Sequence, residues 1–148
     1  MKGGEKMKGT IMSVVGVAGS FIAGLFGGWS SALTTLVIFM GVDLVTGWIL
    51  AVVFHKSPKT ESGAYESKTG WKGLCRKCMT FLLVFVSYRI DIIIGSSYVM
   101  DAVCIAFIFN EIVSIIENAG LMGLPIPNVL KNAIDILKNK SEGAEKDA

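Results

Sequence analysis

Histidine, cysteine and charged side chains are scarce in this chain of 148 residues. The chain has one histidine, His55, and the pair Cys75 and Cys78 forms a lone C-x-x-C motif. A zinc site needs two such pairs or additional histidines. Three cysteines is an odd count, which indicates free thiols rather than a disulfide framework. Because a glycine-rich phosphate loop and a serine–histidine–aspartate set are also missing, we expect no metal, no cofactor and no catalytic residues.

The low charge content argues against a soluble domain and against nucleic acid as a partner. Charged residues make up 18% of the chain, hydrophobic residues make up 52%, and the mean hydropathy is +0.60. The formal net charge is only +2, which is too weak to indicate binding to nucleic acid. The apolar residues are gathered into runs of bilayer length instead of short periodic stretches. The composition therefore indicates a membrane protein.

The apolar runs predict an all-α, multi-pass membrane protein. Four spans are expected at about residues 11–29, 33–54, 78–94 and 98–116. The first run of roughly 19 residues covers about 28 Å as a helix, which matches the hydrocarbon core. Arg89 and Asp91 interrupt the third run, and three spans is the alternative if they prevent it from crossing. The membrane domain is therefore expected to cover residues 1–120, with a polar loop at 55–77.

Residues 121–148 are expected to form a separate cytoplasmic segment. Pro125 and Pro127 favour an extended turn, and Asn128 can cap a helix that follows it. That helix is expected to reach about Lys140 and to be amphipathic. Its apolar face would consist of Leu130, Ala133, Ile134 and Leu137. Such a helix suits a membrane surface or a partner protein, and a charged tail follows it.

The placement of basic residues predicts the orientation of the spans. The loop 55–77 carries Lys56, Lys59, Lys68, Lys72, Arg76 and Lys77. Both tails also carry lysines, whereas the short turns at 30–32 and 95–97 carry no basic residue. Loops on the cytoplasmic side are enriched in lysine and arginine. We therefore expect both termini and the loop 55–77 in the cytoplasm, with the basic residues of the loop touching anionic lipid.

Small residues form a ridge along the first span. They recur every four positions, at Gly16, Ser20, Gly24 and Gly28. Small residues let two helices approach backbone to backbone, and this contact drives helix association in lipid. The ridge is expected to pack against another helix, either in a second copy of the chain or in the second span of the same chain.

Ionisable side chains lie inside the expected spans, where each costs about 2.5–3.5 kcal/mol at a helix centre. The acidic residues are Asp43, Asp91, Asp101 and Glu111, and the basic residue is Arg89. Arg89 is placed to pair with Asp91 or Asp101 across the turn at 95–97. Asp43 and Glu111 have no obvious cation.

Helical spacing gathers polar residues on one face of two of the spans. Asp43, Thr46 and Gly47 share a face of the second span, and Glu111 and Ser114 belong to a polar stripe on the fourth. Polar faces turned away from lipid indicate a wet interior or a polar helix interface. A buried structural hydrogen-bond network is the alternative.

Three stretches of the sequence resemble the toxin-secretion/phage-lysis holin family. The first is Asp43-x-x-x-Gly47 in the second span, and the second is the basic stretch from Ser67 through Arg76 and Lys77. The third is the segment 110–118, with Asn-Glu-x-x-Ser-Ile-x-Glu-Asn, followed by Gly-Leu-Pro-Ile-Pro at 123–127. Together these stretches span about residues 35–140.

The resemblance implies a non-enzymatic protein of the bacterial cytoplasmic membrane. Such a protein oligomerises with itself and opens lesions through which an endolysin or a toxin leaves the cell. Two rival functions remain. One is a small proton-coupled transporter or channel in which Asp43 and Glu111 gain and lose protons. The other is an antiholin-like regulatory protein that recruits a partner through its C-terminal helix.

Overall fold

The computed structural model describes residues 2–136. All regular secondary structure in this part of the chain is helical. Its elements are α1 (Lys2–Leu25), α2 (Ser31–Ile49), the π-helical segment η1 (Leu50–Phe54), α3 (Ser67–Ile94) and α4 (Val99–Leu121). A further helix covers residues 128–136, and residues 2–136 contain no strand. The prediction of an all-α fold is therefore confirmed.

Within residues 2–136, three segments are long and apolar enough to cross a membrane. They are Glu5–Leu25, Ser31–Phe54 and Val99–Leu121, and they correspond to the first, second and fourth expected spans. The chain is thus a multi-pass helical membrane protein. Helix α3 is not among these segments, because Lys77, Arg89 and Asp91 interrupt its apolar residues.

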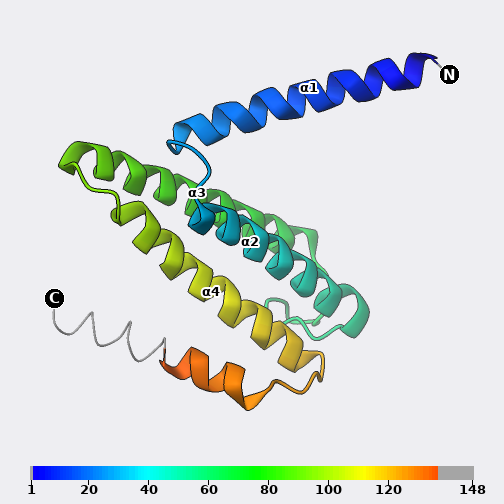
Figure 1. Cartoon of the computed structure of the whole chain (residues 1–148). Coiled ribbons are helices and arrows are strands. Elements are labelled where there is room, and N and C mark those ends of the chain that lie inside the picture. Colours follow the sequence, from blue (N-terminus) through cyan, green and yellow to red (C-terminus); the bar gives the residue numbers. More distant parts are fainter. Residues whose placement is uncertain (1, 137–148) are drawn as a thin grey trace.

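Helices α2, α3 and α4 form a three-helix bundle, in which α4 packs against both α2 and α3 (Figure 1). Helix α3 runs in the opposite direction to the other two. The buried core residues lie on all three helices and immediately after the end of α1. They are Phe26, Leu33, Leu36, Met40, Val84, Met100 and Cys104. Phe26 meets Phe85 of α3 edge to face, with ring centroids 6.0 Å apart.

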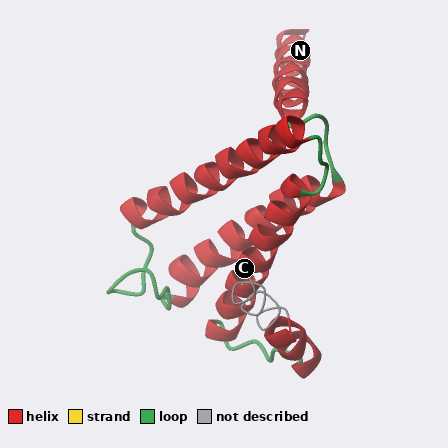
Figure 2. Ribbon diagram, turned by 90° about the vertical axis from the view of Figure 1, so that its left-hand side faces the viewer, coloured by secondary structure: helices red, strands yellow, loops and turns green. Residues whose placement is uncertain are grey.

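Helix α1 projects away from this bundle (Figures 1 and 2). No residue of its apolar window is buried within the subunit. The helix ends at Leu25, and Gly27 and Gly28 follow it with φ values of 70° and 115°. These left-handed angles favour glycine, which has no Cβ to clash. The expected ridge of four small residues is therefore shorter by one, because Gly28 lies in the turn and only Gly16, Ser20 and Gly24 lie on the helix.

Helix α3 begins eleven residues earlier than the expected third span. The structure places Ser67 at its first turn, so the loop ends at residue 66 and does not reach residue 77. Lys68, Lys72, Arg76 and Lys77 consequently lie on a helix, in contrast to the basic loop that we expected. The glycines at 70 and 73 lie within this helix, and Lys77 near its middle forms ion pairs with α2 and α4.

A C-terminal helix is present near the expected position and includes residue 128, which was expected to cap it. The backbone N–H of Leu130 donates to the carbonyl of Pro127 at 3.0 Å, which starts the first turn. Ile134 is half-buried, and Val129 and Leu130 are exposed. The expected continuation through Leu137 to Lys140, and the charged tail, lie outside the described residues.

Candidate functional site

One lysine joins the three helices of the bundle through ion pairs. Lys77 of α3 places its Nζ 2.9 Å from Oδ2 of Asp43 on α2 and 2.5 Å from Oε2 of Glu111 on α4. The exposed fractions of the three side chains are only 12%, 10% and 13%, respectively. Asp43 and Glu111 therefore have a common cation, which our sequence analysis did not identify.

An amide extends this cluster along the α2–α4 interface. Nδ2 of Asn118 donates to Oδ1 of Asp43 at 3.3 Å and to Oγ1 of Thr46 at 3.1 Å. A Cβ at Gly47 would lie 3.7 Å from the same Nδ2, which is an ordinary van der Waals contact, so Gly47 faces the amide. The polar faces of α2 and α4 thus meet each other. We call Asp43, Thr46, Lys77, Glu111 and Asn118 the polar cluster.

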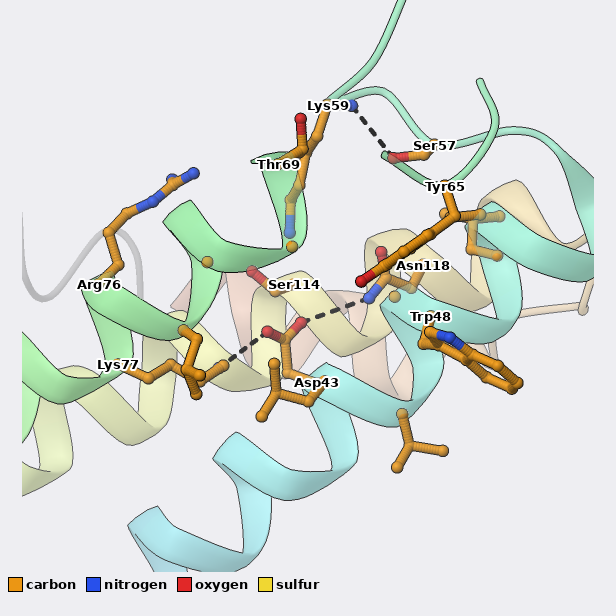
Figure 3. Close-up of a pocket in the computed structure, with 18 of the residues that line it drawn as sticks. Asp43, Trp48, Ser57, Lys59, Tyr65, Thr69, Arg76, Lys77, Ser114 and Asn118 are labelled. Carbon is orange, nitrogen blue, oxygen red and sulfur yellow. Dashed lines mark hydrogen bonds and ion pairs between the residues drawn. The ribbon is translucent and has the colours of Figure 1, made fainter. Parts of the chain in front are cut away.

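A cleft of about 940 Å³ opens beside the polar cluster (Figure 3). Its walls come from the C-terminal half of α2, the loop 55–66, the first half of α3 and the second half of α4. Aromatic residues Trp48, Tyr65 and Trp71 line it, together with Ser114 and every member of the cluster except Thr46. The polar faces therefore adjoin both a buried hydrogen-bond network and an open space large enough for water.

The π-helical segment η1 redirects the chain from α2 into the loop 55–66, which forms one wall of this cleft. The backbone N–H groups of His55 and Lys56 both donate to the carbonyl of Leu50, which widens the last helical turn. His55 adopts φ 52°, a left-handed angle that is uncommon outside glycine. The backbone N–H of Ser57 then donates to the carbonyl of Gly63 at 2.9 Å and closes the loop. Single π-turns are frequent at functional sites.

Three other charged residues predicted inside the spans do not join the polar cluster. They are Arg89, Asp91 and Asp101, at the other end of the bundle. Asp91 is buried and accepts hydrogen bonds from the backbone N–H groups of Val99 and Met100, at 3.0 and 2.8 Å, and from the hydroxyl of Ser96. Asp101 is exposed beside a smaller pocket of about 330 Å³. Arg89 is exposed, and within residues 2–136 it forms no ion pair. The expected pairing of Arg89 with Asp91 or Asp101 is therefore wrong, because Asp91 faces the first turn of α4 instead.

The roles of two members of the polar cluster were not predicted. Lys77 was expected in a basic loop that touches anionic lipid, and Asn118 was noted within the segment 110–118 that resembles the holin family. A signal for Lys77 was present, since polar residues flank Val84 at positions 77, 80, 87 and 91. These alternating spacings of three and four residues define one helical face. Had the helix been extended back to residue 67, this face would have placed Lys77 toward the other spans.

The cysteines offer no assembled metal site in the described part of the chain. Cys75 and Cys78 are exposed free thiols on α3, and Cys104 is a buried free thiol on α4. Within residues 2–136, no three histidine, cysteine, aspartate or glutamate side chains are grouped to hold a metal ion.

Comparison with known proteins identifies the family. Residues 20–139 match the sequence profile of the bacteriophage holin family. An uncharacterized protein of Halalkalibacterium halodurans is 35% identical over 132 residues, which cover 85% of this chain and 90% of that protein. An uncharacterized protein of Listeria monocytogenes is 35% identical over 124 residues, 83% of each chain. A probable holin of Bacillus phage phi105 is 30% identical over 111 residues, 74% of this chain and 76% of that protein.

No solved structure matches the chain. The family profile covers α2, α3 and α4 completely and reaches the end of α1, so it includes every member of the polar cluster. Profile and relatives agree over most of the chain, and the chain therefore belongs to the bacteriophage holin family.

Proposed function

We propose that this protein is a holin that assembles in the bacterial cytoplasmic membrane and opens lesions through which an endolysin or a toxin is released. Family membership and the similarity to a probable holin of a Bacillus phage support this proposal. On this proposal the protein is not an enzyme. Its partners are further copies of itself, membrane lipid and the released protein.

The observation that carries the proposal is the unpartnered state of α1. This helix is long and apolar enough to cross a membrane, yet its apolar window has no buried residue in the single subunit. A Cβ added at Gly16 or Gly24 would meet no atom within 4 Å. An open small-residue face in lipid is suited to close helix packing. Contact between α1 helices of neighbouring subunits is therefore the assembly step that we propose.

We also propose that α3 crosses the membrane with its neighbours, which gives four spans. Helix α3 extends alongside α2 and α4 in the bundle (Figure 2). At about 1.5 Å per residue, its 28 residues are long enough to cross a bilayer. Both termini and the loop 55–66 then lie in the cytoplasm, with Lys68, Lys72 and Arg76 near the anionic headgroups.

Inducible expression in a bacterial host tests the proposed function. A potential-sensitive dye reports the membrane potential, and a co-expressed cytoplasmic endolysin reports release. A holin should cause abrupt depolarisation together with escape of the endolysin. Steady potential and retained endolysin, in cells whose membranes contain the protein, would refute the proposal.

A small proton-coupled transporter is the second candidate, and the cleft that reaches the polar cluster favours it. A transporter of this kind would place a substrate beside Asp43 and Glu111. It would show saturable substrate flux without lysis, and Asp43→Asn would abolish that flux. Lesions, in contrast, should pass unrelated solutes without saturation.

A further inference from the structure

The three bundle helices depend on Lys77 for all their ionic contacts within the described residues. Both ion pairs formed there share its ammonium group. Helices α2 and α3 pack mainly against α4 and touch each other little. The pair between Lys77 and Asp43 therefore spans α2 and α3 where the cleft separates them.

Removal of Lys77 would leave two largely buried carboxylates facing each other. Asp43 and Glu111 both lie within ion-pair distance of the same nitrogen, so they repel each other without it. The other charged groups at the cleft are Lys59 and Glu66 from the loop and Arg76 from α3. The side chain of Arg76 points away from Asp43 in Figure 3. An uncompensated buried charge draws in water or separates from its neighbour.

A core of buried apolar side chains begins directly beyond the polar cluster. Phe107 lines the cleft and also packs against this core. Cys104 lies one helical turn from Phe107, toward the N-terminus of α4, and is 0% exposed. Val84 on α3 is also 0% exposed. From Glu111 to Cys104 is seven residues, or about 10 Å of helix. The ion pairs of Lys77 therefore lie between the open cleft and the buried core of the bundle.

We propose that Lys77 is a charge latch, which means that its ion pairs hold the three helices together at the cleft end of the bundle. Loss of these ion pairs admits water to the core and makes lesions open earlier. The timing part of this inference rests on the proposed holin function. The closure part concerns the single subunit and does not require lysis. Lys77 acts as a positioning residue, through Asp43 and Glu111.

The native thiol of Cys104 is a reporter for closure. In a Cys75→Ser, Cys78→Ser background of the full chain, it is the remaining cysteine. The rate at which N-ethylmaleimide modifies it in membrane vesicles measures access of water and reagent to the core. Lys77→Met should raise this rate about tenfold or more, because a buried pair has lost one partner. Lys77→Arg, which keeps the charge, should restore slow modification.

Lys72→Met is the matched control. Lys72 lies on the same helix and carries the same charge, but it is exposed and does not line the cleft. Its replacement should leave the Cys104 modification rate unchanged. Equal rates for Lys77→Met and the parent, with both proteins inserted in the membrane, would overturn the latch.

A triple variant that removes all three charges of the cluster tests the latch if Lys77→Met does not fold. In the combination Lys77→Met, Asp43→Asn, Glu111→Gln, the like charges are gone and Asn118 still has an oxygen to bind at position 43. Slow Cys104 modification in this variant supports the latch, whereas fast modification there shows that Lys77 matters for packing alone and overturns it.

The onset of depolarisation in the expression assay separates this inference from the proposed function. Earlier onset with Lys77→Met than with Lys72→Met supports both. Fast modification of Cys104 in a protein that never depolarises cells keeps the latch and refutes the holin function. Depolarisation of cells without any change in modification rate keeps the holin function and refutes the latch.

Discussion

Asp91 of α3 accepts a hydrogen bond of 2.8 Å from the backbone N–H of Met100 in the first turn of α4. The same carboxylate accepts from Val99 at 3.0 Å, and the N-cap residue of α4, Tyr98, makes no side-chain cap of its own. The first N–H groups of a helix have no partner within that helix. An acid on the preceding helix thus caps α4 and fixes the turn between the two helices.

Asp91→Ala should lower the free energy of unfolding by about 1–2 kcal/mol, because the α4 cap is lost. Titration of the micelle-solubilised protein with a denaturing detergent, followed by circular dichroism, measures this change. Asp101→Ala is the control, since Asp101 lies in the first turn of α4, the turn that Asp91 caps, but is exposed. It should cost less than about 1 kcal/mol, the helix-dipole contribution. Equal losses for the two variants would show that Asp91 has no special capping role.

Asn118→Ala should destabilise the α2–α4 interface, since it removes the donor to Asp43 and Thr46. Hydrogen bonds between membrane helices average about 0.6 kcal/mol, so the loss of two should cost roughly 1 kcal/mol. The same detergent titration measures it. Asn110→Ala is the matched control, because Asn110 is exposed on α4. If both variants unfold at the same detergent fraction as the parent, the amide is not part of a stabilising network.

The positions of α2 and α4 could be predicted closely from the sequence. The expected spans at 33–54 and 98–116 compare with Ser31–Phe54 and Val99–Leu121 in the structure. An apolar run of bilayer length has few alternatives to a spanning helix. The start of α3 could not be found in this way, because basic residues and glycines at 67–77 resemble a loop when their neighbours in space are unknown.

The members of the polar cluster could be predicted only in part, again because the sequence does not show which residues are neighbours in space. Helical spacing gave the face of α2 that carries Asp43 and the face of α4 that carries Glu111. Spacing along one helix does not show which faces meet, or that a lysine from a third helix lies between them. Likewise, the ridge on α1 was visible in the sequence, but the sequence left open whether α2 covers it. In the single subunit nothing lies within 4 Å of a Cβ built at Gly16 or Gly24.

Gly24→Leu should weaken self-association of the full chain, because a large side chain on the small-residue face keeps helix backbones apart. Chemical crosslinking in membranes, with insertion checked by membrane fractionation, measures the fraction of oligomer. Ala18→Leu is the matched control, since Ala18 is also exposed on α1 but lies on roughly the opposite side of the helix. We expect a clear loss of crosslinked species for Gly24→Leu and little change for Ala18→Leu. The same loss in both would indicate an effect of bulk anywhere on α1.

The number of spans can be decided by labelling single cysteines on either side of α3. In a background without the three native cysteines, Ser62→Cys lies in the loop 55–66 and Ser97→Cys lies in the turn before α4. If α3 crosses the membrane, these two positions lie on opposite sides. A membrane-impermeant thiol reagent should then label Ser97→Cys in intact protoplasts and should label Ser62→Cys only after permeabilisation. Labelling of both positions from the same side would show that α3 does not cross, because Lys77, Arg89 and Asp91 would then keep it at one face of the membrane.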